Sequence, residues 1–381
     1  MKIGIMTFHK SINYGSVLQA YALAYKLREM GHEPEIIDYE PHNYNDQYQI
    51  IQPPFSMKAV KHDFVNLTFY RAMKNRKAAF EQFRKKHLPL TSKEYYYGDD
   101  LSELNGKYDL FICGSDQIWN TDAADFDTAY FFPFISNTPK IAYAVSLNKG
   151  ELSNTAEPER LKESIMDFKA LSSREVSGQK KIYDFIDGQK DVHVVLDPTL
   201  LNDKSAYQAL SEKRIIDEQY IFFYSINYAS AAVKAASLVA ERLNLPVYTL
   251  VNGKGSRALY NMKKGGKIKI IKDDVSPEDF LSLICHAEKV VTNSFHGTAF
   301  SIIFEKDFYS VQNIDETGNP KNDTRIFNIL NFLEIQDRYK TVEELKTTDL
   351  TSKIDYSKVK LKRDEQIQES IHFLKTHIEN R

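Results

Sequence analysis

The sequence has little of several features that would mark a specialised class of protein. It has only two cysteines, Cys113 and Cys285, in 381 residues, so a disulfide framework is excluded. Both lie in or beside apolar runs and neither stands at zinc-ligand spacing, so we expect reduced packing residues and no bound metal. No apolar run approaches the roughly 20 residues that cross a bilayer, and the apolar N-terminus is too short for a signal peptide. These absences predict a soluble, cytoplasmic protein.

The chain also lacks an excess of either charge. Lys and Arg total 50 against 52 for Asp and Glu, so we expect no nucleic acid as partner. One segment is an exception: residues 58–87 carry nine basic residues against two acidic ones, a local charge of 9 − 2 = +7. Its main interpretation is the solvated face of a long helix. The alternative is a surface that rests on anionic lipid headgroups, as a peripheral protein at the inner face of the cell membrane.

A chain of 381 residues exceeds what one hydrophobic core usually serves, so we expect two domains. The opening alternates an apolar strand, a helix from Ser16 to Met30 and a second strand, which predicts a βαβ unit. The glycine spacing of a dinucleotide site is absent, so no such cofactor is expected. Asn13 and Gly15 precede the helix instead. Gly15 would let the backbone approach a ligand closely, or it is a plain turn glycine.

Polar residues follow other predicted strands of the first half. Ser115 and Asp116 come directly after the apolar run Tyr108–Cys113. In open α/β sheets ligands bind at the carboxyl ends of strands, so we expect these side chains in a site. Arg174 follows a short apolar run and suits a carboxylate or phosphate ligand. The alternative for Arg174 is an ion pair with Glu175 or another acid.

The most informative stretch of the second half is residues 289–304, which reads as strand, tight turn and buried helix. The start of that helix would offer unpaired N–H groups and the positive end of its dipole to an anion. The expected substrate-binding residues here are Asn293, Ser294, Gly297 and Thr298, with His296 among them. The alternative is that Ser294 only caps the helix and His296 is an interior histidine.

Three more segments give structural or functional predictions. Residues 252–267 combine four glycines with basic side chains, which predicts a mobile loop over an anionic substrate or a merely solvated loop. Arg325 opens a short helix, where a cation is disfavoured by the dipole, so we expect a ligand or an acidic partner for it. The spacing of Ile367, Ile371, Leu374 and Ile378 predicts a final helix with one apolar face.

Together these motifs resemble the polysaccharide pyruvyl transferase family over about residues 1 to 335. The matching stretches are Asn13-Tyr-Gly-Ser-Val-Leu-Gln-Ala-Tyr-Ala-Leu23, Gly114-Ser-Asp-Gln-Ile-Trp119, Ser173-Arg-Glu175, Asp197-Pro-Thr-Leu200 and Ser294-Phe-His-Gly-Thr298. The resemblance implies an α/β, GT-B-like fold in which two Rossmann-like domains with parallel sheets face an interdomain cleft. It implies an acceptor domain over residues 1–200, a donor domain over 201–355 and a C-terminal helix over 356–381 that returns to the first domain.

The resemblance also implies a reaction without a cofactor. The enolpyruvyl group of phosphoenolpyruvate (PEP) is transferred to two hydroxyls of a sugar or lipid-linked oligosaccharide, which forms a pyruvate ketal and releases phosphate. His296 matches the family histidine and would act as acid or base, with Asp116 as its partner at the acceptor. Arg174 matches the family arginine. Many members carry Arg two positions before the histidine, where this chain has Ser294, so Arg325, Arg257 or a lysine of residues 252–267 would replace that cation.

Two other functions fit the same sequence. A nucleotide-sugar glycosyltransferase would share the architecture, and the missing arginine at position 294 favours it. A non-catalytic glycan-binding protein would use some of the 23 Tyr and 23 Phe as sugar-stacking faces, although such side chains are more often core.

Overall fold

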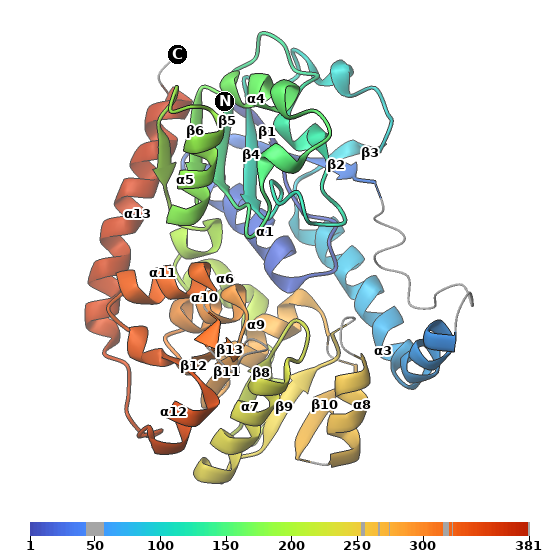
Figure 1. The fold of residues 1–381 in the computed structure, drawn as a ribbon, viewed down its shortest axis with the longest axis vertical. Helices are drawn as coiled ribbons and strands as arrows, with labels where there is room; N and C mark the ends of the chain where they lie inside the picture. The colour runs from blue at the N-terminus through green and yellow to red at the C-terminus, as the bar shows by residue number, and fades with distance from the viewer. Residues whose placement is uncertain are drawn as a thin grey trace. The chain divides into compact units, whose positions relative to one another are not determined.

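Two parallel β-sheets organise the chain, one in each of two units (Figure 1). This computed structural model describes residues 1–42, 57–252, 256–265, 267–273, 275–314, 320–321 and 323–379. The first unit comprises Met1–Gln47, Arg84–Asn202 and Arg363–Arg381, and the second comprises Tyr48–Phe83 and Asp203–Lys362.

The first unit holds a seven-stranded sheet in the order β3-β2-β1-β4-β5-β6-β7, and its strand pairs are all parallel. Its strands are β1 (Lys2–Met6), β2 (Glu33–Glu40), β3 (Leu90–Tyr96), β4 (Leu110–Asp116), β5 (Lys140–Val145), β6 (Ala170–Ser173) and β7 (Val192–Val194). Its helices include α1 (Tyr14–Glu29), α4 (Pro158–Met166) and α5 (Val176–Phe185). The strand order reverses between β1 and β4, which makes this pair the topological switch point.

The second unit repeats the plan with a six-stranded sheet in the order β10-β9-β8-β11-β12-β15. Its strands are β8 (Ile221–Tyr224), β9 (Val247–Leu250), β10 (Ile268–Ile271), β11 (Lys289–Thr292), β12 (Asp307–Val311) and β15 (Tyr339–Lys340), beside the small antiparallel pair β13 (Asn313–Ile314) and β14 (Pro320–Lys321). Its helices include α6 (Ser205–Ser211), α7 (Ser230–Leu243), α8 (Ser256–Gly265), α9 (Pro277–Cys285), α10 (Phe295–Ile303), α11 (Thr324–Phe332) and α12 (Val342–Thr347). The switch point lies between β8 and β11, and the predicted α/β fold with two parallel sheets is confirmed.

The opening βαβ unit is confirmed as β1, α1 and β2. Helix α1 begins where Asn13 accepts a hydrogen bond from the Gly15 N–H at 3.0 Å, which satisfies one of the unpaired amides of the first turn. It is followed by Gly31, whose φ of 85° lies in the left-handed region that glycine adopts at no steric cost. The two ends of α1 therefore follow directly from the local sequence.

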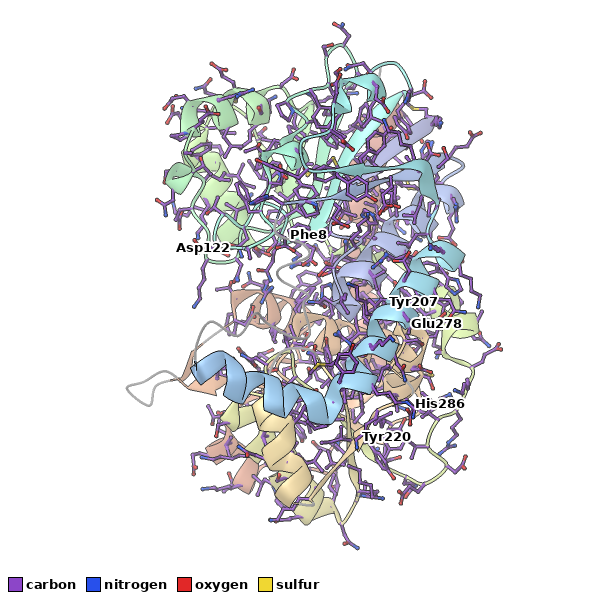
Figure 2. The ribbon with its side chains drawn as sticks, turned by 90° about the vertical axis from the view of Figure 1, so that its right-hand side faces the viewer. Phe8, Asp122, Tyr207, Tyr220, Glu278 and His286 are labelled. Carbon is purple, nitrogen blue, oxygen red and sulfur yellow. The ribbon has the colours of Figure 1, made fainter. Side chains whose placement is uncertain are left out.

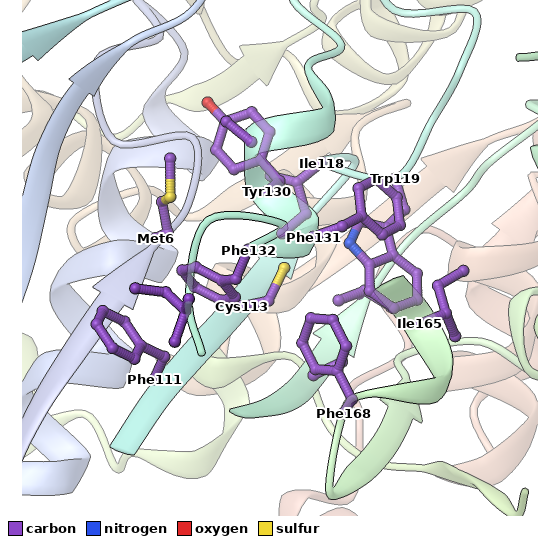
Figure 3. Close-up of a cluster of buried hydrophobic side chains, with 14 of the residues drawn as sticks. Met6, Phe111, Cys113, Ile118, Trp119, Tyr130, Phe131, Phe132, Ile165 and Phe168 are labelled. Carbon is purple, nitrogen blue, oxygen red and sulfur yellow. The ribbon is translucent and has the colours of Figure 1, made fainter. Parts of the chain in front are cut away.

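The core of the first unit is rich in aromatic side chains (Figure 3). Trp119 is fully buried, stacks on Phe131 with ring centroids 4.6 Å apart, and meets the edge of Phe168 at 5.7 Å. Cys113 is buried in the same cluster, and burial raises the pKa of its thiol well above the ordinary value. Cys113 and Cys285 are both free, as predicted.

The second unit uses polar tips of large side chains to tie its elements together (Figure 2). The Tyr220 hydroxyl, just before β8, donates to the Leu283 carbonyl of α9 at 2.9 Å. The His286 ring nitrogen Nε2 lies 3.1 Å from the Ser211 carbonyl at the end of α6. Both side chains thus find a backbone partner for their polar atom.

Two parts of the fold differ from the sequence expectations or were missed by them. Residues 252–267 were expected to form a loop, but the structure has α8 there, because Leu259 and Met262 lie one turn apart and are both buried. Residues 253–255 and 266 lie outside the described part. Strand β3 was missed because it is an edge strand whose residues are mostly exposed, so it shows no buried alternation.

Two long helices complete the architecture. Helix α3 (Met57–His87) is the basic helix that the sequence predicts; the side chains of residues 57–68 lie outside the described part. Helix α13 (Tyr356–Glu379) is the predicted final helix, and its residues from Arg363 onward belong to the first unit. There the Ser370 hydroxyl accepts the Leu196 N–H at 2.9 Å.

We expect the stability of the protein to fall in mild acid because of His377 on α13. Its pKa is lowered, first by burial and then by the positive charges of His193, Lys169 and His372. A histidine with a lower pKa in the folded state stabilises the fold above about pH 6.5, and this contribution is lost as the pH falls toward the folded-state pKa. The melting temperature should therefore decrease between about pH 7.5 and 5.5, less steeply in His377→Gln. An equal slope in both proteins would contradict this assignment.

Candidate functional sites at the two switch points

Asp116 ends β4 at the switch point of the first sheet. Its φ of 71° lies in the left-handed region, which aspartate tolerates better than most residues and which recurs at functional sites. Its carboxylate has two partners from different elements: the Ser16 hydroxyl of α1 donates to Oδ2, and Arg174 Nη2 donates to Oδ1 at 3.3 Å. The carboxylate is therefore held in one orientation and is almost completely buried.

Arg174 lies just after β6 in the centre of a group of acids. Its Nη1 donates to Asp197 at 2.7 Å and its Nε lies 3.6 Å from Glu175, in addition to the contact with Asp116. The Arg174 side chain is 1% exposed. Burial lowers the pKa of Arg174, but the attraction of Asp197, Asp116 and Glu175 more than offsets this and raises it above the ordinary value.

The acids around Arg174 are themselves fixed by further hydrogen bonds. The Ser115 hydroxyl and the Thr199 N–H donate to Asp197, each at 3.0 Å, and the Ser146 hydroxyl donates to Glu175 at 2.7 Å. The alternative for Arg174, an ion pair with Glu175 or another acid, is therefore what the structure shows. Sequence reasoning did not select Asp197, Glu175 or Ser16 as site residues. The position of Asp197 soon after β7 is the same signal that selected Ser115 after β4.

The structure brings the predicted residues of the first half to one edge of one sheet. Asn13 caps α1 and Gly15 lies in its first turn, and Ser115 and Asp116 end the neighbouring strand β4. Arg174 joins them through Asp116. This is the edge where open α/β sheets bind ligands.

The predicted helix start in the second unit is the N-terminus of α10, next to the end of β11. The Gly297 N–H donates to the Ser294 hydroxyl at 3.4 Å and the Thr298 N–H donates to the Ser294 carbonyl at 3.0 Å. Ser294 is therefore the helix cap. A Cβ at Gly297 would lie 2.3 Å from the Thr292 hydroxyl, so only glycine allows this approach of helix and strand.

His296 occupies the first turn of α10. It is 7% exposed, and its ring meets the edge of Phe295 at a centroid distance of 5.1 Å. A buried imidazole at a helix N-terminus is well placed to act on an anionic ligand.

Two polar groups at the second switch point have no hydrogen-bond partner among the described residues. Ser225 directly follows β8, is completely buried, and its hydroxyl is unpaired. Asn293 directly follows the neighbouring strand β11 and its side-chain oxygen is also unpaired. Buried polar groups without partners are rare and costly, so such a pair is a candidate ligand contact. Sequence reasoning found Asn293 but missed Ser225, which only the strand order brings opposite it.

Arg325 begins α11 and already has an acidic partner. Its Nε and Nη2 donate to the two carboxylate oxygens of Asp323 at 2.9 and 2.5 Å, a bidentate pair. The acidic partner expected from the sequence is therefore Asp323, and a role for Arg325 in substrate binding stays a prediction. The side chain of Arg257, another candidate cation, lies outside the described part.

Within the residues that the structure describes, no group of three or more His, Cys, Asp or Glu side chains is arranged to hold a metal ion. Within the same residues, every helix is too short or too polar to cross a membrane.

Comparison with known proteins adds a family and a fold. The family model described as polysaccharide pyruvyl transferase matches residues 13–315. A comparison with curated protein sequences gave no match.

Several solved structures resemble the chain along its length. A UDP-forming α,α-trehalose-phosphate synthase from Burkholderia xenovorans is 9% identical, with 100% of this chain and 98% of that chain covered and a TM-score of 0.53. MnaA of S. aureus, in a structure with UDP, is 11% identical, with 99% and 96% covered and a TM-score of 0.52. A putative UDP-N-acetylglucosamine 2-epimerase from Listeria monocytogenes is 10% identical, with 99% and 96% covered and a TM-score of 0.50. At such identities the likeness is one of fold, and it confirms the predicted GT-B-like class.

Replacement of Arg174 should destabilise the protein strongly. Arg174→Met would leave Asp116, Asp197 and Glu175 buried without their cation, which typically costs about 3–5 kcal/mol. Urea unfolding measures the loss. The matched control is Arg160→Met, whose side chain is 70% exposed and should change stability by less than about 0.5 kcal/mol. Similar small effects of both substitutions would show that the cluster does not depend on Arg174.

Proposed function

The chain belongs to the polysaccharide pyruvyl transferase family, and on this premise we propose that it transfers the enolpyruvyl group of PEP to two hydroxyls of one sugar. The family makes the protein a transferase that acts on a sugar or polysaccharide acceptor. We propose in addition that PEP is the donor and that the product is a cyclic ketal.

The proposed reaction has two steps. In the first, the PEP methylene carbon gains a proton while a sugar hydroxyl oxygen forms a bond to the central carbon and loses its proton. In the second, a neighbouring hydroxyl oxygen bonds to the same carbon and loses its proton, the bond from that carbon to the phosphate oxygen breaks, and inorganic phosphate leaves with that proton. The protein must therefore supply an acid, a base and groups that balance the charges of carboxylate and phosphate.

We assign the base to Asp116. Its carboxylate would accept the proton of the attacking hydroxyl or orient the acceptor. The hydrogen bonds from Ser16 and Arg174 support this role, because they fix the direction in which the carboxylate oxygens face. In this scheme Arg174 holds Asp116 in place, and its own charge is balanced by Asp116, Asp197 and Glu175.

We assign the acid to His296, the residue that matches the family histidine. An imidazole has an ordinary pKa near neutrality and can donate a proton to the methylene carbon and recover it later. The N-terminus of α10 would favour the anionic donor, with Asn293 and Ser225 as hydrogen-bonding partners and Arg325 as a further cation.

The strongest support for this function is the match of the family model over residues 13–315, which includes both Asp116 and His296. Each residue also lies at the switch point of its sheet, which is where open α/β sheets bind ligands.

A lipid-linked acceptor would fit the basic helix α3. Of its described side chains, five cations are exposed: Arg71, Lys74, Lys77, Lys85 and Lys86. Several such cations attract a protein to anionic headgroups by about 1 kcal/mol each.

We expect His296→Ala to reduce turnover by about a hundredfold or more without unfolding the protein. The measurement is phosphate release from PEP in the presence of a panel of sugars, with circular dichroism as the check on folding. His87→Ala, on α3 and outside the proposed machinery, is the matched control and should keep wild-type turnover. Full activity of His296→Ala would remove this residue from the mechanism. Release of a nucleoside diphosphate from a nucleotide sugar, with none of phosphate from PEP, would favour a glycosyltransferase instead.

A further inference from the structure

An exposed pair of tyrosines extends the carboxyl end of β3 in the first unit. Tyr96 is 47% and Tyr97 is 61% exposed, although large aromatic side chains are usually buried. Exposed aromatic groups that adjoin each other often mark a binding surface rather than a defect in packing. We call Tyr96, Tyr97 and the adjoining His42 the aromatic turn.

The backbone of the aromatic turn is locked. The Asp99 N–H donates to the Tyr96 carbonyl at 3.0 Å, and the Tyr96 N–H donates to the Asp99 carboxylate at 2.8 Å. Gly98, at the third position, has a φ of 92°, as a type II turn requires. The Tyr97 N–H donates to the Glu40 carbonyl at 3.0 Å, which ties the turn to β2. Rings on such a turn lose little conformational freedom when a ligand binds.

The rings themselves are also held in place. The Tyr97 and His42 rings lie 4.7 Å apart. The Lys10 ammonium lies 5.4 Å from the centre of the Tyr96 ring. A hydrogen bond between the Tyr96 hydroxyl and Glu94 raises the pKa of Tyr96 to about 12, so the hydroxyl stays protonated at neutral pH.

Hydrogen-bonding groups of mainly negative charge surround the Tyr96 ring. The Lys10 ammonium lies 3.4 Å from Asp38 and 3.6 Å from Glu40, and it also contacts Glu94. His9 Nε2 also lies 2.9 Å from Asp38, so among the described residues Lys10 and His9 face three carboxylates, and Glu94 is exposed. Such a surface offers acceptors to hydroxyl groups and repels an anionic ligand.

The aromatic turn is connected to the first switch point through one short segment. Lys10 belongs to the connection between β1 and α1 that ends at Asn13, and Ser16 from the first turn of α1 contacts Asp116. A ligand on the aromatic turn would therefore lie along the same edge of the sheet as the proposed base.

We propose that the aromatic turn binds an uncharged pyranose ring of the acceptor polysaccharide. The apolar CH face of the sugar packs on the tyrosine rings, and its hydroxyls bond to Glu94 and the groups around Lys10. The identification of this sugar as the acceptor rests on the proposed function. The charge balance selects neutral sugars over uronic acids.

Saturation-transfer difference NMR on the full chain tests the proposal. The probes are the methyl pyranosides of glucose, galactose, mannose and N-acetylglucosamine, with methyl glucuronide as the anionic comparison. At least one neutral pyranoside should bind more tightly than the glucuronide. Tyr96→Ala and Tyr97→Ala should each weaken its binding by about fivefold or more, the loss expected for an aromatic contact. Tyr96→Phe keeps the ring and should keep most of the binding.

The matched control is Tyr183→Ala, because Tyr183 is 45% exposed in the same unit and should not affect sugar binding. Absence of binding by every neutral pyranoside, or equal binding by wild type and both alanine variants, would overturn the proposal. So would a change of oligomeric state in Tyr97→Ala, seen by light scattering, since the turn would then contact a second copy. A thermal-shift measurement with PEP on the same samples distinguishes the proposed sugar site from the proposed PEP donor. If PEP does not raise the melting temperature but a neutral pyranoside binds, PEP is contradicted as the donor and the sugar site is retained.

Discussion

The first unit depends on one buried cation. The guanidinium of Arg174 contacts carboxylates from three parts of the chain, at the end of β4, just after β6 and after β7. Because the strands that carry them are parallel, all three acids lie at one edge of the sheet, where without a cation they would repel one another. The arginine therefore allows a dense group of acids in an apolar setting. The same contacts fix the orientation of Asp116, so packing stability and the geometry of the site have a common origin.

The two units place the polar groups of their candidate sites in the same way. Each sheet has the order of a Rossmann-like fold, and in each the polar groups of interest follow the two central strands. In the first unit most of these groups bond to one another, around Asp116 and Arg174, and Glu175 Oε2 is the buried carboxylate oxygen of this cluster that has no hydrogen-bond partner among the described residues. In the second, Ser225 and Asn293 keep polar atoms without partners among the described residues. The first arrangement suits a rigid base, and the second suits a site whose hydrogen bonds are completed by a ligand.

Much of this fold is predictable from local sequence, because apolar runs, caps and glycines determine where β1, α1 and α10 begin and end. The residues that directly follow strands, such as Asp116 and Asn293, are predictable for the same reason. The partners of these residues are not. Asp197 and Ser225 become neighbours of the site only through strand order, which local patterns do not encode. Strand β3 was missed because most of its residues are exposed. Helix α8 was missed because it ends in lysines and a glycine, and among its described side chains Leu259 and Met262 are the buried ones.

The path of α13 has a consequence for how the protein is made. Residues 363–381 belong to the first unit, and Ser370 bonds to Leu196 and the Phe373 ring contacts Tyr143 there. The ribosome therefore completes the sheet of the first unit long before it supplies the helix that packs on it. This unit cannot finish folding before α13 has been synthesised, and its helix-binding surface must stay protected from aggregation until then.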